Sequence, residues 1–192
     1  MRRGVVGGGA LIVSASGLSA LPGVALADDT LPDGDLAYLR LVLAAELLAV
    51  DFQTKALGSG KLHPAAHALF RRLRSDESAH YTELAAVLTA AGQTPATSAD
   101  IDFSYPKGTF RSQASLTKLA ARLERLLLGA YVGAVENVET ATVRLPLGQI
   151  AANEAQHAGA LAALRGGSVV GKAFAPALSI GAVSDALDEF ES

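Results

Sequence analysis

The chain has 192 residues, of which 50% are hydrophobic, and its 16 basic and 19 acidic residues leave a formal net charge of −3. It contains no cysteine, which excludes disulfides, iron–sulfur clusters, cysteine-attached haem and thiol chemistry. The basic residues form no stripe with interleaved aromatic side chains, so we expect no nucleic acid among the partners. The length suits one domain with a hydrophobic core, and the abundance of Ala and Leu favours helices over a sheet.

The first 27 residues resemble a signal peptide for export. Arg2 and Arg3 precede a charge-free segment rich in Gly, Ala and Ser, which ends Ala-Leu-Ala before Asp28 and so offers a small-x-small cleavage site. The paired arginines are typical of a twin-arginine signal, although an ordinary secretory signal or an uncleaved anchor also fits. We expect residues 1–27 to be cleaved and residues 28–192 to be exported, to the periplasm or out of the cell, as one four-helix domain.

The first expected helix runs from Asp35, its N-cap, to about Leu57. Apolar residues recur along it at helical spacing, and Glu46 falls on the same face. An acidic residue there is either buried or a surface residue on an imperfect apolar face. The apolar residues on both sides favour burial of Glu46.

The second expected helix begins near Pro64, because proline is favoured in the first turn, and it ends at the Ala-Gly pair after its last apolar residue. Its inward face carries Glu77 and His80 among Leu, Phe and Val side chains. His63 and His67 are spaced like a metal-binding pair. His67 precedes His80 by 13 residues, which is roughly 20 Å along a helix, so we expect both residues to lie in a solvated first turn.

The segment 93–115 contains two prolines and several Ser and Thr residues without a long apolar period, which predicts a connection that can pass from one end of a bundle to the other. The third helix is expected from about Leu116, with Glu124 on its apolar face. The fourth is expected over 144–164 and repeats the Glu-x-x-His pattern of the second. A short amphipathic segment over 182–190 is expected to cover one end of the bundle.

The motif Glu77-x-x-His80 therefore has a second copy, Glu154-x-x-His157. Residues three apart lie on one face of a helix, about a turn from each other. A carboxylate and an imidazole placed in this way can hold one metal ion together. One copy could arise by chance, but two copies in the two halves of the chain indicate a pair of metal positions.

An additional Glu precedes each motif by about thirty residues. Glu46 and Glu124 are related by an offset of 78, and the two motifs by an offset of 77. Glu136 is the second-ranked candidate on the third helix, because its offset from Glu46 is 90 and it lies across the turn expected at Pro146. The predicted metal ligands are Glu46, Glu77, His80, Glu124, Glu154 and His157.

These motifs resemble the ferritin-like superfamily, and most closely its exported bacterial branch that includes desiccation-related proteins. The likeness covers about residues 36–190 and also rests on the Leu-Glu…Ala-Tyr segment at 123–131, the Ile-Asp-Phe-Ser that begins the crossover at 101–104, and the Phe-Ala-Pro-Ala-Leu at 174–178. It implies an all-α fold, a ferritin-like left-handed four-helix bundle with a long crossover between helices two and three. It also implies a central site for two divalent metal ions, Fe or Mn.

Four carboxylates would balance the charge of two divalent ions, and imidazole and carboxylate are suitable ligands for both metals. In this arrangement Glu77 and Glu154 bridge the two ions. The other ligands are terminal, with one Glu and one His for each ion. Six protein ligands leave coordination positions open for oxygen, peroxide or water.

The resemblance further places Asp76 against His157 and Asn153 against His80, as acceptors for the outer ring nitrogens of the histidines. Tyr81 fits either a place beside the site or the hydrophobic core, and the same holds for the tyrosine at 131.

Members of the superfamily with this site activate oxygen or peroxide, oxidise and store ferrous iron, or act as oxidases. We therefore expect an exported di-metal carboxylate protein that reacts with oxygen or peroxide, in iron oxidation or in oxidative or desiccation stress. The alternative is a non-catalytic exported bundle that acts as a stress or interaction protein. Ferroxidase-like activity and assembly into a homo-oligomer both stay open. A haem-binding cage subunit is disfavoured, because Met1 is the single methionine.

Overall fold

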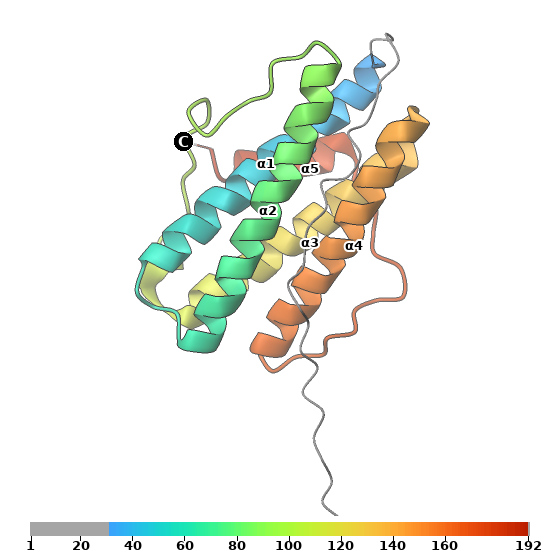
Figure 1. Cartoon of the computed structure of the whole chain (residues 1–192). Coiled ribbons are helices and arrows are strands. Elements are labelled where there is room, and N and C mark those ends of the chain that lie inside the picture. Colours follow the sequence, from blue (N-terminus) through green and yellow to red (C-terminus); the bar gives the residue numbers. More distant parts are fainter. Residues whose placement is uncertain (1–30, 192) are drawn as a thin grey trace, which may run out of the picture.

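A computed structural model describes residues 31–191 (Figure 1). Within this range the chain forms α-helices and no β-strand, and none of its helices is long and apolar enough to span a membrane. The predicted signal peptide and its cleavage site lie outside the described residues. The helices are α1 Asp33–Gly58, α2 Pro64–Ala90, α3 Gln113–Asn137, α4 Ala141–Leu164 and the short α5 Ile180–Asp188.

The four long helices form two hairpins that pack into one bundle (Figure 1). Short turns over 59–63 and 138–140 join α1 to α2 and α3 to α4. Across the hairpins, α1 packs against α3 and α2 against α4. Each long helix therefore has two neighbours and turns one face toward a shared interior. The predicted all-α, ferritin-like bundle is confirmed.

The connection between α2 and α3 travels along the bundle (Figure 1). It contains a 3₁₀ turn, Thr109–Arg111, and ends beside the α1–α2 turn, where the backbone N–H of His63 donates to Gln113 Oε1 at 2.8 Å. Tyr105 anchors it, since its ring lies 5.7 Å from that of Phe52 and its hydroxyl donates to Asp51 Oδ2 at 2.7 Å. The structure thus confirms the long crossover.

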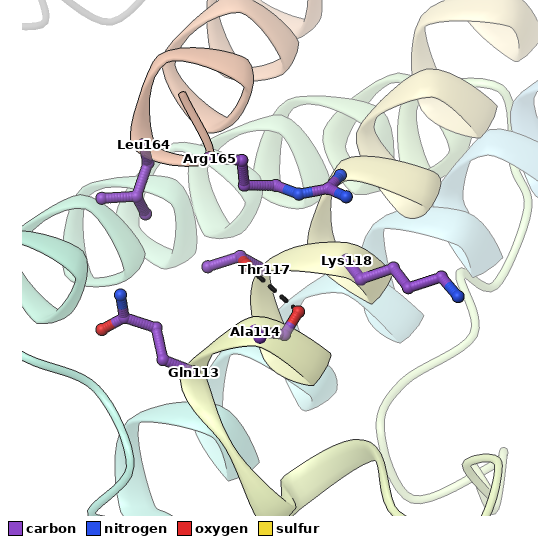
Figure 2. Close-up of a pocket in the computed structure, with 6 residues that line it drawn as sticks. All are labelled: Gln113, Ala114, Thr117, Lys118, Leu164 and Arg165. Atoms are coloured by element: carbon purple, nitrogen blue, oxygen red, sulfur yellow. Dashed lines mark hydrogen bonds between the residues drawn. The ribbon is translucent and has the colours of Figure 1, made fainter. Parts of the chain in front are cut away.

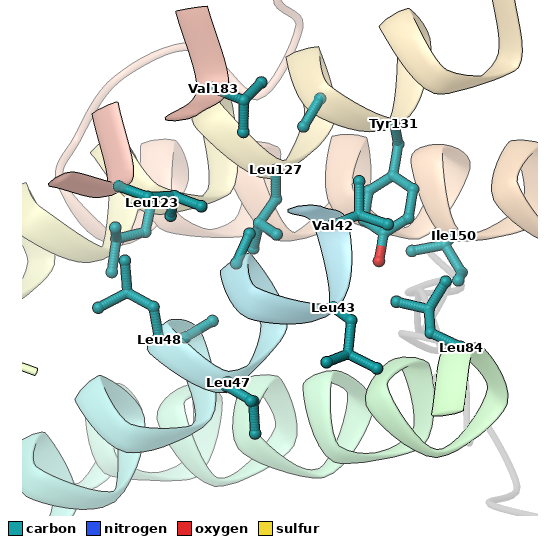
Figure 3. Close-up of a cluster of buried hydrophobic side chains, with 14 of the residues drawn as sticks. Val42, Leu43, Leu47, Leu48, Leu84, Leu123, Leu127, Tyr131, Ile150 and Val183 are labelled. Carbon is teal, nitrogen blue, oxygen red and sulfur yellow. The ribbon is translucent and has the colours of Figure 1, made fainter. Parts of the chain in front are cut away.

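The core is built from Leu, Val, Ala and Phe side chains on the inner faces of the helices (Figure 3). Leu127 from α3 points toward α1, Leu43 from α1 lies toward α2, and Leu84 from α2 faces Ile150 from α4. Burial of such apolar area is the main force that holds the helices together. Four glutamate side chains share this interior. The free-energy cost of burying their charges must be offset by other interactions.

The expected starts of α1, α3 and α4 are wrong, in each case because the helix begins earlier in the sequence. Ser112 caps α3, since its Oγ accepts the Ser115 N–H at 3.2 Å, so α3 begins three residues before Leu116. Pro146 does not mark a turn but lies buried inside α4, which begins at Ala141. Pro146 is the sixth residue of α4, past the first turn, so it removes one backbone hydrogen bond from the helix.

Asp35 does not cap the first helix. Pro32 occupies that position, without a side-chain cap, and Asp35 lies buried inside the first turn of α1. Its carboxylate instead accepts the backbone N–H groups of Glu139 and Thr140 at 2.8 and 2.9 Å. It thus ties the start of α1 to the turn between α3 and α4.

We expect Asp35→Ala to lower the free energy of unfolding by about 1–3 kcal/mol, because it leaves backbone donors in the α3–α4 turn without their acceptor. Chemical denaturation measures the change. Asp33→Ala is the matched control, since Asp33 lies exposed in the same helical turn and has the same relation to the helix dipole. Equal effects of the two substitutions would contradict a stabilising role for the hydrogen bonds from Glu139 and Thr140 to Asp35.

The C-terminal segment covers the side of the α1–α3 pair, not an end of the bundle as expected. α5 packs against both helices and buries Val183 and Leu187 (Figure 3). The irregular segment before it crosses α3 closely, and the Leu178 N–H donates to the Gly129 carbonyl at 2.9 Å. A Cβ on Gly133 would meet the Leu178 carbonyl oxygen well inside van der Waals contact.

Gly133→Ala should therefore destabilise the protein by about 1–3 kcal/mol, the usual cost of overpacking. A backbone oxygen cannot rotate away as a side chain can, so the clash outweighs the roughly 1 kcal/mol that Ala gains over Gly in a helix. Gly148→Ala is the control, because its Cβ would meet only Val135 Cγ2 at 4.0 Å. Thermal unfolding of both variants tests this, and a Gly133→Ala protein as stable as the control would refute the close crossing.

Candidate metal centre

The structure brings all six predicted ligand side chains together at the centre of the bundle, from four different helices. The carboxylates of Glu46, Glu77, Glu124 and Glu154 are fully buried, and the two histidines are almost so. They belong to these elements: Glu46 to α1, Glu77 and His80 to α2, Glu124 to α3, and Glu154 and His157 to α4.

The six side chains form two overlapping groups, each able to hold one ion. The His80 position consists of Glu46, Glu77, His80 and Glu154, and the His157 position of Glu77, Glu124, Glu154 and His157. Within each group one ligand atom of every residue lies within 4.8 Å of the others.

Glu77 and Glu154 each direct one oxygen to each position. Glu77 Oε2 lies 3.0 Å from His80 Nδ1, and its Oε1 lies 3.1 Å from His157 Nδ1. The corresponding distances for Glu154 are 3.1 Å from Oε1 to His80 and 3.5 Å from Oε2 to His157. A carboxylate that presents separate oxygens to two positions has the geometry of a bridging ligand.

Glu46 from α1 and Glu124 from the neighbouring helix α3 complete the two positions. Glu46 Oε1 lies 3.5 Å from His80 Nδ1, and Glu124 Oε2 lies 3.1 Å from His157 Nδ1. The two imidazole rings lie 6.1 Å apart and are nearly parallel. Both histidines turn Nδ1 toward the carboxylates, so Nδ1 is the nitrogen available to a metal.

Several buried oxygen atoms in this cluster make no hydrogen bond. They are Glu46 Oε2, Glu77 Oε1 and both oxygens of Glu154. Each imidazole Nδ1 can donate only one proton, yet three carboxylates surround it. A buried carboxylate oxygen without a donor is costly, and a divalent cation removes that cost directly. The residues present therefore fit a pair of hard or borderline metal ions.

Burial, followed by the nearby charge of Glu77, raises the pKa of Glu46 and of Glu124 well above the usual 4.5. Burial alone would also raise the pKa of Glu77, but the adjacent imidazoles of His157 and His80 outweigh burial and lower that pKa to about 2. In the absence of metal, the terminal carboxyls therefore hold protons more readily than Glu77.

The pKa values of the two histidines are raised, whereas burial usually lowers the pKa of an imidazole. Burial acts to lower the pKa of His80, but the surrounding carboxylates, Glu154 foremost, outweigh burial and raise that pKa to about 12. Burial also acts to lower the pKa of His157, yet hydrogen bonds to Asp76 and Glu124 raise that pKa far above the usual 6.5. Without metal, protons on these imidazoles balance part of the carboxylate charge.

Only one of the two expected partners of the outer histidine nitrogens is in place. Asp76 Oδ2 lies 3.2 Å from His157 Nε2, and Arg72 Nε donates to the same oxygen at 2.6 Å. Asn153 is half-buried, and in residues 31–191 no hydrogen bond joins it to His80. The expected Asn153–His80 contact is therefore not formed.

Two contacts to the terminal carboxylates go beyond the sequence reasoning, which left the tyrosine at 131 either beside the site or in the core and gave Gln53 no role in the site. The Tyr131 hydroxyl donates to Glu46 Oε1, and Gln53 Nε2 donates to Glu124 Oε1 at 3.4 Å. Gln53 and Tyr131 are fully buried and are related by the same offset of 78 residues as the two glutamates. That shared offset was the signal that could have found them.

The rival candidates lie away from the centre. Glu136 is exposed at the end of α3, and His63 and His67 are exposed at the start of α2. Tyr81 donates its hydroxyl to the Ala96 carbonyl at 3.0 Å, so it serves the crossover, not the site.

A separate hollow of about 450 Å³ opens on the surface between the start of α3 and the end of α4 (Figure 2). It shares no residue with the two metal positions. It is lined by Gln113, Ala114, Thr117, Lys118, Leu164 and Arg165.

Comparisons with known proteins agree with the fold. Residues 34–167 match the family model of the ferritin-like domain. The chain is also similar to a conserved hypothetical protein from Mycobacterium tuberculosis whose crystal structure is known, with a TM-score of 0.60 and 22% identity over 68% of this chain and 96% of that one. At this identity the likeness concerns the fold alone. No curated protein matches the chain.

Proposed function

We propose that this chain, which belongs to the ferritin-like domain family, binds two divalent metal ions, iron or manganese, at the centre of its bundle. The observation that carries the proposal is the shared pair of carboxylates. Glu77 and Glu154 each belong to both candidate positions, and each presents a separate oxygen to each. A chance cluster of buried acids would have no reason to adopt this arrangement.

In this proposal Glu77 and Glu154 bridge the ions, Glu46 and His80 complete one position, and the remaining two ligands complete the other. The helices hold these side chains in place before any ion arrives, so little reorganisation is needed on binding. Iron or manganese held there supplies redox chemistry toward oxygen or peroxide at the coordination positions that six protein ligands leave open. The surrounding apolar side chains exclude bulk water from the centre.

A second candidate, a non-catalytic bundle that acts in stress or interaction, has one observation in its favour. The histidines already pair with the carboxylates without metal, for example His80 Nδ1 with Glu77 Oε2 at 3.0 Å. Such pairing could sustain the fold without any reaction. Measurement of metal content and of ferrous ion oxidation separates the two candidates.

The test is metal analysis of protein purified through its own export pathway, followed by anaerobic loading with Fe²⁺ and exposure to oxygen. We expect two metal ions per chain and oxidation of ferrous ion faster than in buffer alone. A chain that takes up no ion from either Fe²⁺ or Mn²⁺ solutions would overturn the proposal. A chain that binds two ions but oxidises none would support the non-catalytic candidate.

Export is part of the proposal and is supported by the signal-like start of the sequence, as is placement in the exported, desiccation-related branch. We expect the secreted protein to begin at Asp28, which intact mass or N-terminal sequencing can measure. If the route is twin-arginine, replacing Arg2 and Arg3 by Lys should block export. A secreted product that keeps both arginines would contradict cleavage.

A further inference from the structure

We propose that the two metal positions are unequal, and that the His157 position binds its ion first and more tightly than the His80 position. The inference rests on the proposed function, because it concerns the same two ions. Both positions share Glu77 and Glu154, and each adds one Glu and one His. Ligand types alone would make the positions equal, so any difference must come from the residues that contact the ligands.

The first difference concerns the outer nitrogens of the histidines. With Nδ1 turned to the carboxylates, His157 Nε2 faces Asp76 Oδ2 at 3.2 Å and donates its proton to an acidic acceptor. Such a partner fixes the ring orientation and makes the imidazole a stronger ligand. His80 has only Asn153 at the equivalent point of the repeat, which is neutral and makes no hydrogen bond to it within residues 31–191.

Arg72 does not cancel this difference. Its Nε donates to the same Asp76 oxygen at 2.6 Å, which holds the carboxylate in place. The Arg72 side chain is 63% exposed, against 10% for Asp76. Solvent therefore screens the guanidinium charge more than the carboxylate charge, and Asp76 keeps a net attraction for a cation at the His157 position.

The second difference concerns the terminal carboxylates. Tyr131 donates its hydroxyl to Glu46 Oε1, which is the oxygen that faces His80 Nδ1. A donor on that oxygen occupies a lone pair and withdraws charge that the ion would otherwise use. Gln53 contacts Glu124 at 3.4 Å on Oε1, whereas Oε2 is the oxygen that faces His157. The Glu124 ligand oxygen thus stays free of such a donor.

Both differences act in the same direction. The His157 position has the stronger imidazole, the additional negative charge and the unencumbered carboxylate oxygen. At the His80 position the outer nitrogen has no acidic partner, and the Glu46 oxygen that faces His80 already accepts the Tyr131 hydroxyl. The four ligands of each position are otherwise related by the internal repeat of the chain, so the asymmetry depends on Asp76 against Asn153 and on Tyr131 against Gln53.

The test is an anaerobic titration of Mn²⁺ into the metal-free full chain, followed by electron paramagnetic resonance. An isolated Mn²⁺ ion and a spin-coupled pair give different spectra, so the order of filling is read without any assay of activity. We expect isolated bound Mn²⁺ up to one equivalent and coupled pairs only with the second. Anomalous scattering from crystals grown at one equivalent should place that ion beside His157.

Two isosteric variants test whether Asp76 and Asn153 cause the difference in affinity between the two positions. Asp76→Asn keeps an acceptor oxygen but removes the negative charge behind His157, so it should weaken the first binding step by about 10–100-fold, the usual effect of mutating the partner of a metal-bound histidine, and coupled pairs should then appear within the first equivalent. Asn153→Asp should tighten the second step. A general loss of folding would weaken both steps equally and would not change their order.

Several outcomes would overturn the inference. Coupled pairs within the first equivalent of the wild-type chain would mean equal or cooperative positions, and anomalous density beside His80 would mean the reverse order. Unchanged binding in Asp76→Asn would remove its cause. In each case two ions still bind, so the proposed function stands. A wild-type chain that binds no Mn²⁺ and no Fe²⁺ would overturn both.

Discussion

Glu77→Gln and Glu154→Gln should each weaken the binding of both metal ions, not of one. Each carboxylate presents one oxygen to the His80 position and the other to the His157 position. Its replacement by a neutral amide takes the shared negative charge from both positions and leaves a single oxygen that can no longer serve both ions. Loss of a direct ligand should cost at least the roughly 10–100-fold that loss of an indirect partner costs. Metal analysis after equilibrium dialysis measures the result, and we expect both equivalents to fall together.

Terminal ligands should behave differently. Glu124→Gln should weaken chiefly the His157 position, because Glu124 belongs to that group alone. Glu136→Gln, on the same helix, is the matched control, since Glu136 is exposed and far from the cluster, and His67→Ala is a second control on α2. If Glu77→Gln and Glu154→Gln still hold two equivalents with unchanged affinity, the ligand assignment is wrong. A strong loss of bound metal in Glu136→Gln would mean that Glu136, and not Glu124, is the metal ligand on α3.

Without metal, the melting temperature should fall as pH rises above about 6.5, the usual pKa of histidine. The pKa of His80 is raised to about 12 in the folded chain, so the folded state keeps a proton that the unfolded state loses. The same holds for His157, whose pKa is also raised. Each retained proton lowers the stability by about 1.4 kcal/mol per pH unit.

The raised pKa values of Glu46 and Glu124 add to the same slope, because the unfolded carboxyls lose their protons above about 4.5 while the folded ones retain them. Glu77 acts in the opposite sense. Its pKa of about 2 contributes stability that is present above 4.5 and is lost as pH falls toward 2. Metal-free stability should therefore be highest in mildly acidic solution.

Bound metal should reverse this behaviour. Ions that bind only the folded chain stabilise it by about 2.7 kcal/mol each at a free concentration of 100 times Kd. They also displace the protons, so stability should no longer fall above pH 6.5. Calorimetric melts from mildly acidic to mildly alkaline pH, with and without anaerobic Mn²⁺, test this. A melting temperature indifferent to both pH and metal would mean that these groups are solvated.

The helices and the burial of the acidic residues could be predicted from the sequence because the signals are local and periodic. Glu46 and Glu124 interrupt apolar faces whose spacing is helical, and a charge in such a face has nowhere to lie but the core. The spacing in Glu-x-x-His places both side chains on one face of any helix. The repeat offset of about 78 residues then related the two halves of the centre.

Helix starts were predicted less well, because they depend on partners distant in the sequence. Asp35 has the residue type of an N-cap, yet its carboxylate binds backbone N–H groups more than one hundred residues away, at Glu139 and Thr140. Pro146 has the residue type of a turn, yet α4 begins before it. Neither outcome follows from propensity, since packing against another hairpin supplies the hydrogen bonds that decide it.

The sequence by itself determined that this chain is a helical bundle and which six side chains could meet at its centre. The resemblance placed Asp76 against His157 and Asn153 against His80, and only the tertiary structure decided which of these contacts forms and what else supports the ligands. Asp76 reaches His157 while Asn153 does not reach His80, and Tyr131 contacts the ligand oxygen of Glu46. These contacts join different helices, and their formation depends on the rotation and axial offset of each helix against its neighbour. Those quantities are set by packing of the whole core, which no local pattern encodes.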